Sequence, residues 1–448
     1  MFRTVLVANR GEIARRIIRG CRALGLRTVA VYSEADRDAL HVKDADQAVL
    51  LGAAPARESY LNVERILEAA RASGAEAVHP GYGFLSENWR FSESCARAGL
   101  TFIGPSADAI RAMGDKPEAR RRMAAAGVPI VPGTVDPVAD AASAERVAAE
   151  IGYPVILKAA GGGGGIGMVK VAGAAELTAA FATATRRAQS AFGNGAVYVE
   201  RYLQASRHVE VQVFGDTRGT VVHLHERECS IQRRHQKLVE ESPAPNLDTR
   251  TKQGLTAAAL AGARAIGYVN AGTLEFLVDP QGDFYFLEMN TRLQVEHPVT
   301  EEVTGLDLVT AQLHVAAGDA LPFSQDTIQQ RGAAIEVRVY AEDPAKGFLP
   351  SPGTITRLSL PQGEGIRVES GVAEDSVVSV HYDPLLFKLI TRGVDRTQAL
   401  ERLARALDVC ELEGVKTTLP LLRTIVAHPD VRRGRMHTQM VEQGAFHG

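Results

Sequence analysis

The sequence predicts a protein of the α/β and α+β classes with three domains, and three observations lead to this class. The chain has 448 residues, enough for about three domains of the usual size. Its N-terminal quarter alternates short apolar runs with helical segments, which is the pattern of a parallel α/β domain. A small unit with a run of glycines follows, and strand patterns dominate from His208 onward.

Charge and cysteine usage exclude several classes of partner and location. The formal net charge is −3, so no basic surface for nucleic acid or an anionic membrane is expected. The four cysteines are far apart and include no CxxC pair, which favours a reducing compartment. The N-terminus lacks a signal peptide, and no run is long and apolar enough to span a membrane. The sequence therefore predicts a cytoplasmic protein with neither nucleic acid nor a membrane as partner.

The first domain is expected over residues 1–115. A strand at 4–8, a helix at 11–24 and a strand at 28–32 begin a βαβ unit with a parallel sheet. The turn after the first strand lacks a GxGxxG motif, so a dinucleotide site is not predicted here.

A lid domain is expected over 116–203, with its core at about 130–203. Its glycine run lies between two apolar strands, whereas a Walker A or Rossmann loop must lead into a helix. The backbone N–H groups of Gly163, Gly164 and Gly165 can close on phosphate oxygens, and Lys158 adds a positive charge. The alternative is a flexible surface hairpin without a ligand.

The remainder is divided into a metal- and substrate-binding part at 204–330 and a C-terminal mixed β domain at 331–448. Strands are expected at 208–215, 220–228, 272–278, 283–290 and 334–342, and helices at 251–267, 308–317 and 396–411.

Polar side chains occupy every second position between residues 288 and 296, namely Glu288, Asn290, Arg292, Gln294 and Glu296. In an extended chain these side chains share one face, but they would span roughly 26 Å, so we expect a bend after Asn290. The carboxylate and amide oxygens suit Mg²⁺ or Mn²⁺, and the guanidinium suits a small planar oxyanion. Glu296 remains as a candidate base. The alternative is an edge strand with a solvated face.

Three further features can belong to the same site. Glu275 offers another carboxylate from a neighbouring strand, as divalent ions that bridge ATP phosphates require. The cationic cluster at 232–237 can face a phosphoryl group or a small anion. Arg338 lies on the polar face of an alternating strand. Taken alone, each of the three can also be an ordinary surface charge, which is the default for the cluster and for Arg338.

Several motifs together resemble the biotin carboxylases, which are members of the ATP-grasp family. They are HPGYGFLSEN at 79–88, MGDK at 113–116, the glycine loop, RHVEVQV at 207–213, ERECSIQRRHQK at 226–237 and EMNTRLQVEHPVTE at 288–301. The resemblance covers essentially the whole chain. It implies a three-domain ATP-grasp fold and a ligase that carboxylates biotin on a separate carrier, using ATP and bicarbonate, through carboxyphosphate.

The resemblance also implies roles for individual residues. ATP would be bound by Lys116, Lys158, Gly163, Gly164, Gly165, Glu200, Leu203, His208, Gln232, His235, Glu275 and Glu288. Two Mg²⁺ or Mn²⁺ ions would be held by Glu275, Glu288 and Asn290. Bicarbonate would be held by Lys237, Arg292, Gln294 and the backbone of Val295. Glu296 would be the base, Arg338 would stabilise the biotin enolate, and Tyr82 would border the biotin.

The resemblance has departures and implies partners. Ile166 and Arg201 stand where relatives commonly carry a basic residue and lysine, and HYDPLLFKLI at 381–390 leaves the final carboxyl acceptor open. No biotinylation sequence is present, so the implied partners are a biotin carboxyl carrier protein and a carboxyl transferase. A homodimer is implied, with Arg19 and Arg367 near the contact between its two copies.

Two other functions remain possible from the sequence. A different ATP-grasp ligase would use the metal and glycine-loop residues but not the 232–237 cluster, the loop at 292–296 and Arg338 together. A catalytically silent ATP-binding subunit is favoured only by Ile166.

Overall fold

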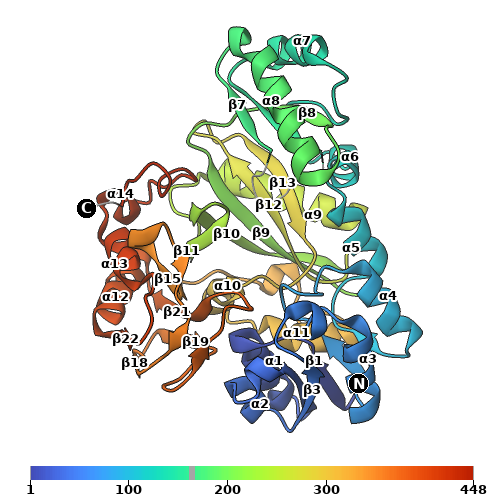
Figure 1. Ribbon diagram of the computed structural model, residues 1–448, viewed down its shortest axis with the longest axis vertical. Coiled ribbons are helices and arrows are strands. Elements are labelled where there is room, and N and C mark those ends of the chain that lie inside the picture. The colour runs from blue at the N-terminus through green and yellow to red at the C-terminus, as the bar shows by residue number, and fades with distance from the viewer. Residues whose placement is uncertain (1, 161–166, 447–448) are drawn as a thin grey trace.

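The computed structural model describes residues 2–160 and 167–446 and has three parts around a central antiparallel sheet (Figure 1). The N-terminal part lies at the bottom of this view, the lid at the top and the C-terminal part at the left. Gly163, Gly164, Gly165 and Ile166 lie outside the described residues.

The N-terminal part contains a five-stranded parallel sheet in the order β3-β2-β1-β4-β5. Its strands are β1 (Thr4–Val7), β2 (Arg27–Ser33), β3 (Gln47–Gly52), β4 (Ala77–His79) and β5 (Thr101–Phe102). Its helices are α1 (Gly11–Ala23), α2 (Leu40–Asp44), α3 (Val63–Ser73), α4 (Trp89–Arg97) and α5 (Ala107–Gly114). Val5 and Val7 of β1 pack with Ile13 of α1, whereas Leu6 packs with Ile66 in a separate core. Alternate residues of β1 are therefore buried in different cores, as expected for a parallel sheet covered on both faces.

The lid is a small three-stranded antiparallel sheet backed by two helices. Its elements are α7 (Ala141–Ile151), β6 (Val155–Ala159), β7 (Val169–Val171), α8 (Ala174–Phe192) and β8 (Val197–Arg201), and α6 (Lys116–Ala125) precedes it. Leu157 and Val199 of the sheet pack against Ala144, Leu177 and Ala184 of the helices. The alanines let the helices approach the strands closely.

The central sheet has eight strands in the order β13-β12-β9-β10-β11-β14-β21-β19, and its strand pairs are antiparallel throughout. The strands are β9 (Arg207–Gly215), β10 (Val221–Arg233), β11 (Gln236–Ser242), β12 (Asn270–Val278), β13 (Phe284–Asn290), β14 (Ala333–Tyr340), β19 (Ile366–Ser370) and β21 (Leu385–Gly393). Because β11 pairs with β14, the sheet continues across the predicted boundary between residues 330 and 331.

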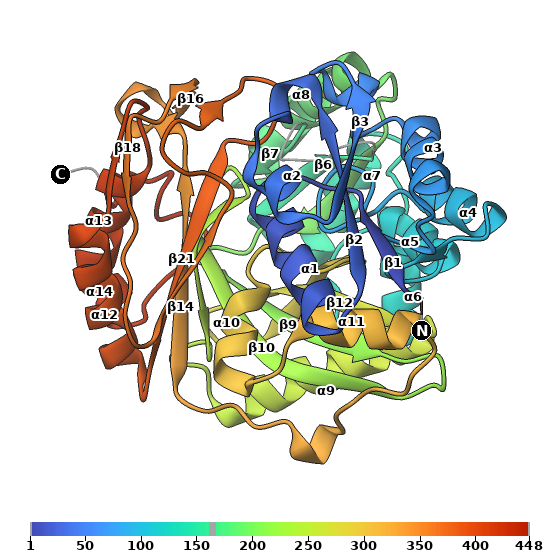
Figure 2. The ribbon, with the colours of Figure 1, turned by 90° about the horizontal axis from the view of Figure 1, so that it is seen from below.

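Helices cover this sheet and connect it to the rest of the molecule. They are α9 (Thr249–Ala265), α10 (His297–Thr304), α11 (Leu308–Ala316), α12 (Arg396–Val409), α13 (Leu419–Ala427) and α14 (Pro429–Arg432). Seen from below, α11 lies beside α1 of the N-terminal part (Figure 2). Leu308 and Val309 of α11 share a core with Ile13 and Ile17 of α1, so the first domain is packed against the central sheet unit.

The remaining elements are short. They are β15 (Glu342–Asp343), β16 (Leu349–Pro350), β17 (Gly353–Thr354), β18 (Arg357–Ser359), β20 (Val377–Val378), β22 (Glu411–Glu413) and 3₁₀ turns at Glu34–Asp36, Ala56–Glu58, Gln325–Thr327 and Pro344–Lys346. Among the described residues, no helix has the length and apolar character required to cross a lipid bilayer.

The sequence located most elements, including the bend after Asn290, which is confirmed because β13 ends at that residue. It missed β11, since the charges at 232–237 concealed a hairpin between β10 and β11. It also missed α10, which begins at His297 immediately after the polar loop.

Candidate active site

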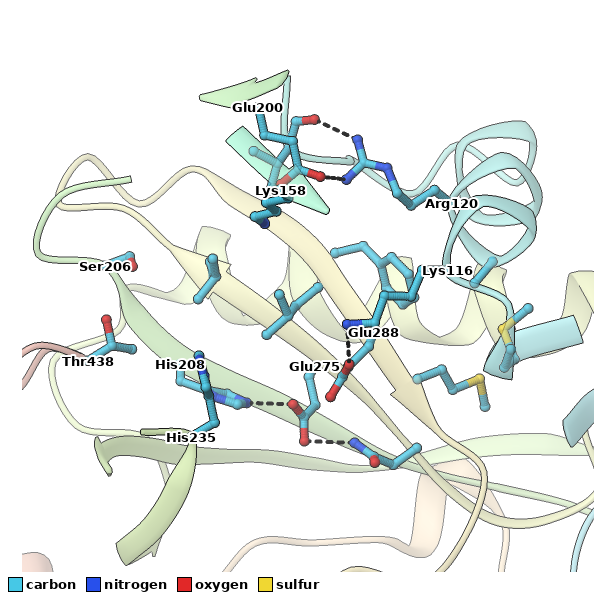
Figure 3. Close-up of a pocket in the computed structure, with 18 of the residues that line it drawn as sticks. Lys116, Arg120, Lys158, Glu200, Ser206, His208, His235, Glu275, Glu288 and Thr438 are labelled. Atoms are coloured by element: carbon cyan, nitrogen blue, oxygen red, sulfur yellow. Dashed lines mark hydrogen bonds and ion pairs between the residues drawn. The ribbon is translucent and has the colours of Figure 1, made fainter. Parts of the chain in front are cut away.

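A cavity of ≈ 690 Å³ lies between the lid, the central sheet and the loop after β13. Among the predicted site residues, it is lined by Lys116, Lys158, Glu200, Leu203, His208, Gln232, His235, Lys237, Glu275, Glu288, Asn290, Arg292, Gln294, Val295, Glu296 and Arg338. Figure 3 shows Lys158 and Glu200 at the lid side and His208, Glu275 and Glu288 at the floor formed by the central sheet. Residues from all three sequence regions after 115 therefore meet in one place.

Lys237 lies at the centre of the floor and contacts three carboxylates. Its Nζ donates to Glu210 Oε2 at 2.6 Å, to Glu275 Oε1 at 2.9 Å and to Glu296 Oε1 at 2.5 Å. Burial would lower the pKa of this ammonium, but the three carboxylates outweigh burial and raise its pKa well above the usual value. Lys237 is therefore a fixed positive charge at the floor of the cavity.

Glu296 is buried and is shared between two cations. Its second oxygen accepts from Nη2 of Arg338 at 2.9 Å, while the first accepts from Lys237. Burial would raise the pKa of Glu296, but Lys237 and Arg338 hold it well below the usual range. The carboxylate is thus ionised at neutral pH and can accept a proton.

Arg338 lies on β14, whose residues are buried along its whole length. The possibility of a surface arginine is therefore wrong for this position. The Nε of Arg338 donates to Glu240 Oε1 at 2.5 Å, so Glu240 and Glu296 hold the guanidinium together. A permanent cation is thereby fixed at the cavity wall.

Arg292 and Asn290 form the edge of the site nearest the N-terminal part. Arg292 Nε donates to Glu87 Oε2 at 2.9 Å, and its Nη2 donates to Asn290 Oδ1 at 2.9 Å. Asn290 Nδ2 in turn donates to Glu275 Oε1 at 2.8 Å. The loop after β13 is therefore held at both its start and its side.

The floor carries a donor set that fits divalent cations. Glu275 and Glu288 are directly opposite each other on β12 and β13. The pKa of Glu288 is raised by burial and by the charge of Glu275, and the nearest cation, Lys116, is 3.9 Å away. Lys237 and Asn290 already contact Glu275, whereas the charge of Glu288 has little compensation, so the pair of facing carboxylates would fit a divalent ion. Asn290 directs its carbonyl oxygen at Arg292 instead, so its part in ion binding stays a prediction.

His208 adds a further ligand-type atom near Glu275. Its Nε2 lies 3.0 Å from Glu275 Oε2, and ligand atoms of His208, Glu210 and Glu275 lie within 4.8 Å of one another. Glu210 is already engaged by Lys237 and Arg227. Glu275 also accepts from Lys237, but it directly faces Glu288 across β12 and β13, so it is the member of this group that would share an ion with Glu288.

The lid side of the cavity carries a cation pair around one carboxylate. Glu200 accepts from Arg120 Nη1 at 2.8 Å and forms an ion pair with Lys158 (Figure 3). Glu200 is buried, and the cations that compensate its charge are Arg120 of α6 and Lys158 of β6. This contact ties the lid sheet to the helix that precedes it.

The cationic cluster at 232–237 comprises the end of β10, a two-residue hairpin turn and the start of β11. Arg234 and His235 both have positive φ, 46° and 68°, a conformation that non-glycine residues rarely adopt. Its members do not all face the cavity: Gln232, His235 and Lys237 line it, whereas Arg233 stacks on the ring of Phe348 at 4.0 Å. The prediction that the whole cluster faces an anion is therefore wrong for Arg233.

Tyr82 does not line this cavity among the described residues. Its hydroxyl donates to Glu12, and its ring lies 6.0 Å from the Nζ of Lys388. Lys388 Nζ donates to the carbonyl of Val295 at 2.6 Å. Tyr82 is thus connected to the loop after β13 through buried charges, and its contact with biotin stays a prediction.

Four supporting carboxylates and cations were not identified from the sequence, namely Glu87, Arg120, Glu210 and Glu240. Glu87 is part of the motif at 79–88 and Glu210 is on the alternating strand at 207–213, so both signals were present in the sequence. Arg120 and Glu240 occupy ordinary helix and strand positions, and only the fold brings them to Glu200 and Arg338.

Three family models match successive parts of the chain. "Biotin carboxylase, N-terminal domain" matches residues 1–110, "Carbamoyl-phosphate synthase L chain, ATP binding domain" matches residues 115–324, and "Biotin carboxylase C-terminal domain" matches residues 336–443.

Several similar proteins match along nearly their whole length. Biotin carboxylase 2 of Bacillus subtilis is 54% identical over 443 residues, which cover 99% of this chain and 100% of that protein. The biotin carboxylase of Halalkalibacterium halodurans is 53% identical over 441 residues, with 98% and 97% covered. The biotin carboxylase domain dimer of Hydrogenobacter thermophilus 2-oxoglutarate carboxylase, in complex with MgADP, ADP and bicarbonate, has a TM-score of 0.93 and 48% identity, with 99% and 98% covered. These matches confirm the predicted three-domain ATP-grasp fold, and the chain belongs to the biotin carboxylase family.

Proposed function

We propose that the chain is a ligase that carboxylates biotin on a separate carrier protein, using ATP and bicarbonate. The observation that carries this proposal is the placement of Glu296 between Lys237 and Arg338, beside Gln294 on the same loop. An ionised carboxylate that touches two fixed cations can take a proton from a small anion that those cations also attract.

In the first step, bicarbonate lies against Lys237, Arg292, Gln294 and the backbone of Val295. Glu296 takes its proton, and a bicarbonate oxygen attacks the γ-phosphorus of ATP. A new O–P bond forms as the bond to the β–γ bridging oxygen breaks, so the products are carboxyphosphate and ADP. Glu275 and Glu288 would hold divalent ions, which would neutralise charge on the phosphate oxygens.

In the second step, carboxyphosphate separates into CO₂ and phosphate within the enclosed site, where water is excluded. The phosphate takes the N1′ proton of biotin, and N1′ then forms a bond to the carbon of CO₂. Negative charge develops on the ureido oxygen, and Arg338 is the fixed cation that stabilises it. Lys116, Lys158 and His208 would bind the nucleotide phosphates, and Glu200 and Leu203 would lie at the adenine.

The proposed partners follow from this chemistry. Biotin arrives on a biotin carboxyl carrier protein, and a carboxyl transferase passes the carboxyl group to the final acceptor. We also propose a homodimer, since the relative from Hydrogenobacter thermophilus is described as a biotin carboxylase domain dimer. Sedimentation of the pure chain then gives twice the 48.0 kDa monomer mass. A monomer at micromolar concentration would contradict the dimer without affecting the proposed reaction.

The test of the reaction is ADP release by the purified chain with Mg²⁺ and ATP, with and without bicarbonate and free biotin. We expect a strong rate only when both are added. An ATP-grasp ligase for another carboxylate would show no dependence on bicarbonate. A silent ATP-binding subunit would bind ATP without turnover under any of these conditions.

A further inference from the structure

Arg227 is a buried arginine of β10 to which the proposed reaction assigns no role. It lies in the motif ERECSIQRRHQK, and its side chain is 0% exposed. A guanidinium remains charged at any physiological pH, so a wholly buried one needs acceptors for all of its N–H groups.

All five N–H groups of Arg227 have an acceptor. Nε donates to Glu210 Oε1 at 2.5 Å, Nη1 donates to Gln212 Oε1 at 2.8 Å and Thr300 Oγ1 at 3.0 Å, and Nη2 donates to Thr273 Oγ1 at 3.2 Å and Gln294 Oε1 at 2.8 Å. These partners belong to β9, α10, β12 and the loop after β13, and all of them are buried. The guanidinium therefore has one defined position relative to four parts of the fold.

The contact with Gln294 determines how its side-chain amide is turned. A guanidinium can only donate, so the amide oxygen of Gln294 must face Arg227. The amide nitrogen then faces the cavity, where it donates to Glu275 Oε1 at 2.7 Å. An N–H donor in this position is what an oxygen of bicarbonate requires.

The contact with Glu210 places a second anion-binding group. One oxygen of Glu210 accepts from Arg227, and the other accepts from Lys237 Nζ at 2.6 Å. Glu210 is 0% exposed, so it has no solvent-facing alternative. The position of Lys237 is thus linked to Arg227 through a single carboxylate.

We propose that Arg227 is the positioning residue of the bicarbonate site, because it orients Gln294 directly and Lys237 through Glu210. The inference rests on the proposed function. Arg227 does not line the cavity among the described residues, so it acts only through these two side chains. Among the described residues, its hydrogen-bond partners do not include Lys116, Lys158 or His208, and it is linked to Glu275 only through Gln294 and Lys237. Its loss should therefore weaken the anion site more than the nucleotide site.

The test is Arg227→Lys, which keeps the charge but removes the planar fork. An ammonium has three donors and cannot reach Glu210 and Gln294 with the geometry of the guanidinium. We expect the KM for bicarbonate to rise by about tenfold or more, as for the loss of a group that orients a ligand-binding side chain. We expect the KM for ATP to stay within about threefold of the wild-type value, because the change weakens binding at the anion site.

Two controls separate positioning from general damage. Arg396→Lys is a matched change, because Arg396 also holds a carboxylate, Glu241, through Nε at 2.5 Å and Nη2 at 3.0 Å, but it does not line the cavity. Thr300→Val removes one acceptor of Arg227 and leaves those on Gln294 and Glu210. Both variants should lower the thermal midpoint while leaving the KM for bicarbonate unchanged.

If Arg227→Lys does not fold, Glu210→Gln is the alternative variant for the same measurement. An amide has one oxygen for the two donors Arg227 and Lys237, so the same selective rise in the KM for bicarbonate is expected. A wild-type KM for bicarbonate in the folded variant, or an equal rise for ATP, would overturn the positioning role. If the rate of ADP release by the wild type does not depend on bicarbonate, both the proposed function and this inference are overturned.

Discussion

At the residue scale, the pKa of a buried carboxylate in the site depends strongly on which charged side chains lie next to it. Glu296 and Glu240 are both buried glutamates that contact Arg338, yet their pKa values move in opposite directions. Glu296 accepts a hydrogen bond from a second cation, Lys237, whereas burial and the charge of Glu296 raise the pKa of Glu240 and Arg338 is the main cation that opposes this shift. One carboxylate is therefore ionised at neutral pH and the other titrates near it.

Arg338→Ala should separate the two steps of the reaction. Arg338 donates to Glu240 and Glu296 and not directly to the proposed nucleotide residues among those the structure describes, so ATP binding should change by less than about threefold. Biotin-dependent turnover should fall by about a hundredfold or more, as when a fixed donor to a developing oxyanion is removed. Measurements are ATP-analogue binding and biotin carboxylation. As the comparison, Glu288→Lys should lose both, because it reverses a charge at the proposed ion site. Normal carboxylation by Arg338→Ala would refute the enolate role.

Glu240→Gln should change how stability depends on pH. Burial raises the pKa of Glu240 to about 7, with Arg338 opposing the shift and Glu296 supporting it, and Lys237 and Glu336 are its other charged neighbours. Between its usual pKa and about 7, the native state holds a proton that the unfolded state has lost, so wild-type stability falls as pH rises through this window.

Glutamine does not titrate, so the variant does not lose this stability as the pH rises. The free energy of unfolding of the variant minus that of the wild type should therefore increase by on the order of a few kcal/mol from pH 5 to 7.5. Urea unfolding of both proteins at several pH values measures the difference. A difference that stays constant over this range would show that Glu240 does not titrate there.

At the element scale, the β10–β11 hairpin combines an unfavourable turn with a functional position. Both turn residues, Arg234 and His235, have left-handed backbones, for which Asn-Gly is the preferred pair. Both residues are exposed, but among the described residues only His235 of the two lines the cavity. The strained turn therefore holds one side chain at the site.

Arg234→Asn should relieve strain without a functional effect. We expect the free energy of unfolding to rise by about 1 kcal/mol, since asparagine tolerates the left-handed region better than arginine. The KM for ATP should be unchanged. His235→Gly, the matched change at the neighbouring position, should raise the KM for ATP because a cavity-lining side chain is lost. Thermal melts and steady-state kinetics test the pair, and an equal KM effect from both changes would contradict this division.

At the scale of the whole molecule, the central sheet joins two regions that the sequence separates. The β11–β14 pairing places residues 239–242 against residues 334–337. The lid, in contrast, has a small core that includes Ala144, Ala148, Ala180 and Ala184. The molecule thus combines one continuous sheet with a lid whose small core contains four alanines.

Native-state hydrogen exchange should show this division. Amides of β9, β11 and β14 should exchange with one common free energy, that of global unfolding, because they belong to one continuous sheet. Amides of β6 and β8 should exchange at lower free energy through local opening of the lid. Exchange of β14 well before β9 would indicate that the C-terminal part unfolds independently.

The sequence by itself determined the local structure and the kinds of functional side chain that are available for a site. The period of two at 288–296 identified the polar face, and its length required the bend that the structure places after Asn290. The βαβ alternation and the glycine run identified the first domain and the lid. Such patterns are readable because strand pleat and turn geometry depend on neighbouring residues only.

Only the tertiary structure decided which charges touch. Lys237, Glu296 and Arg338 are 59 and 42 residues apart in sequence, and the solvated face remained a possible interpretation for each of them. Arg227 has no local signal of burial, yet packing of β9, β12 and α10 around it satisfies all five of its N–H groups. Contacts between distant segments follow from how sheets and helices bury their apolar faces together, and no local pattern records that outcome.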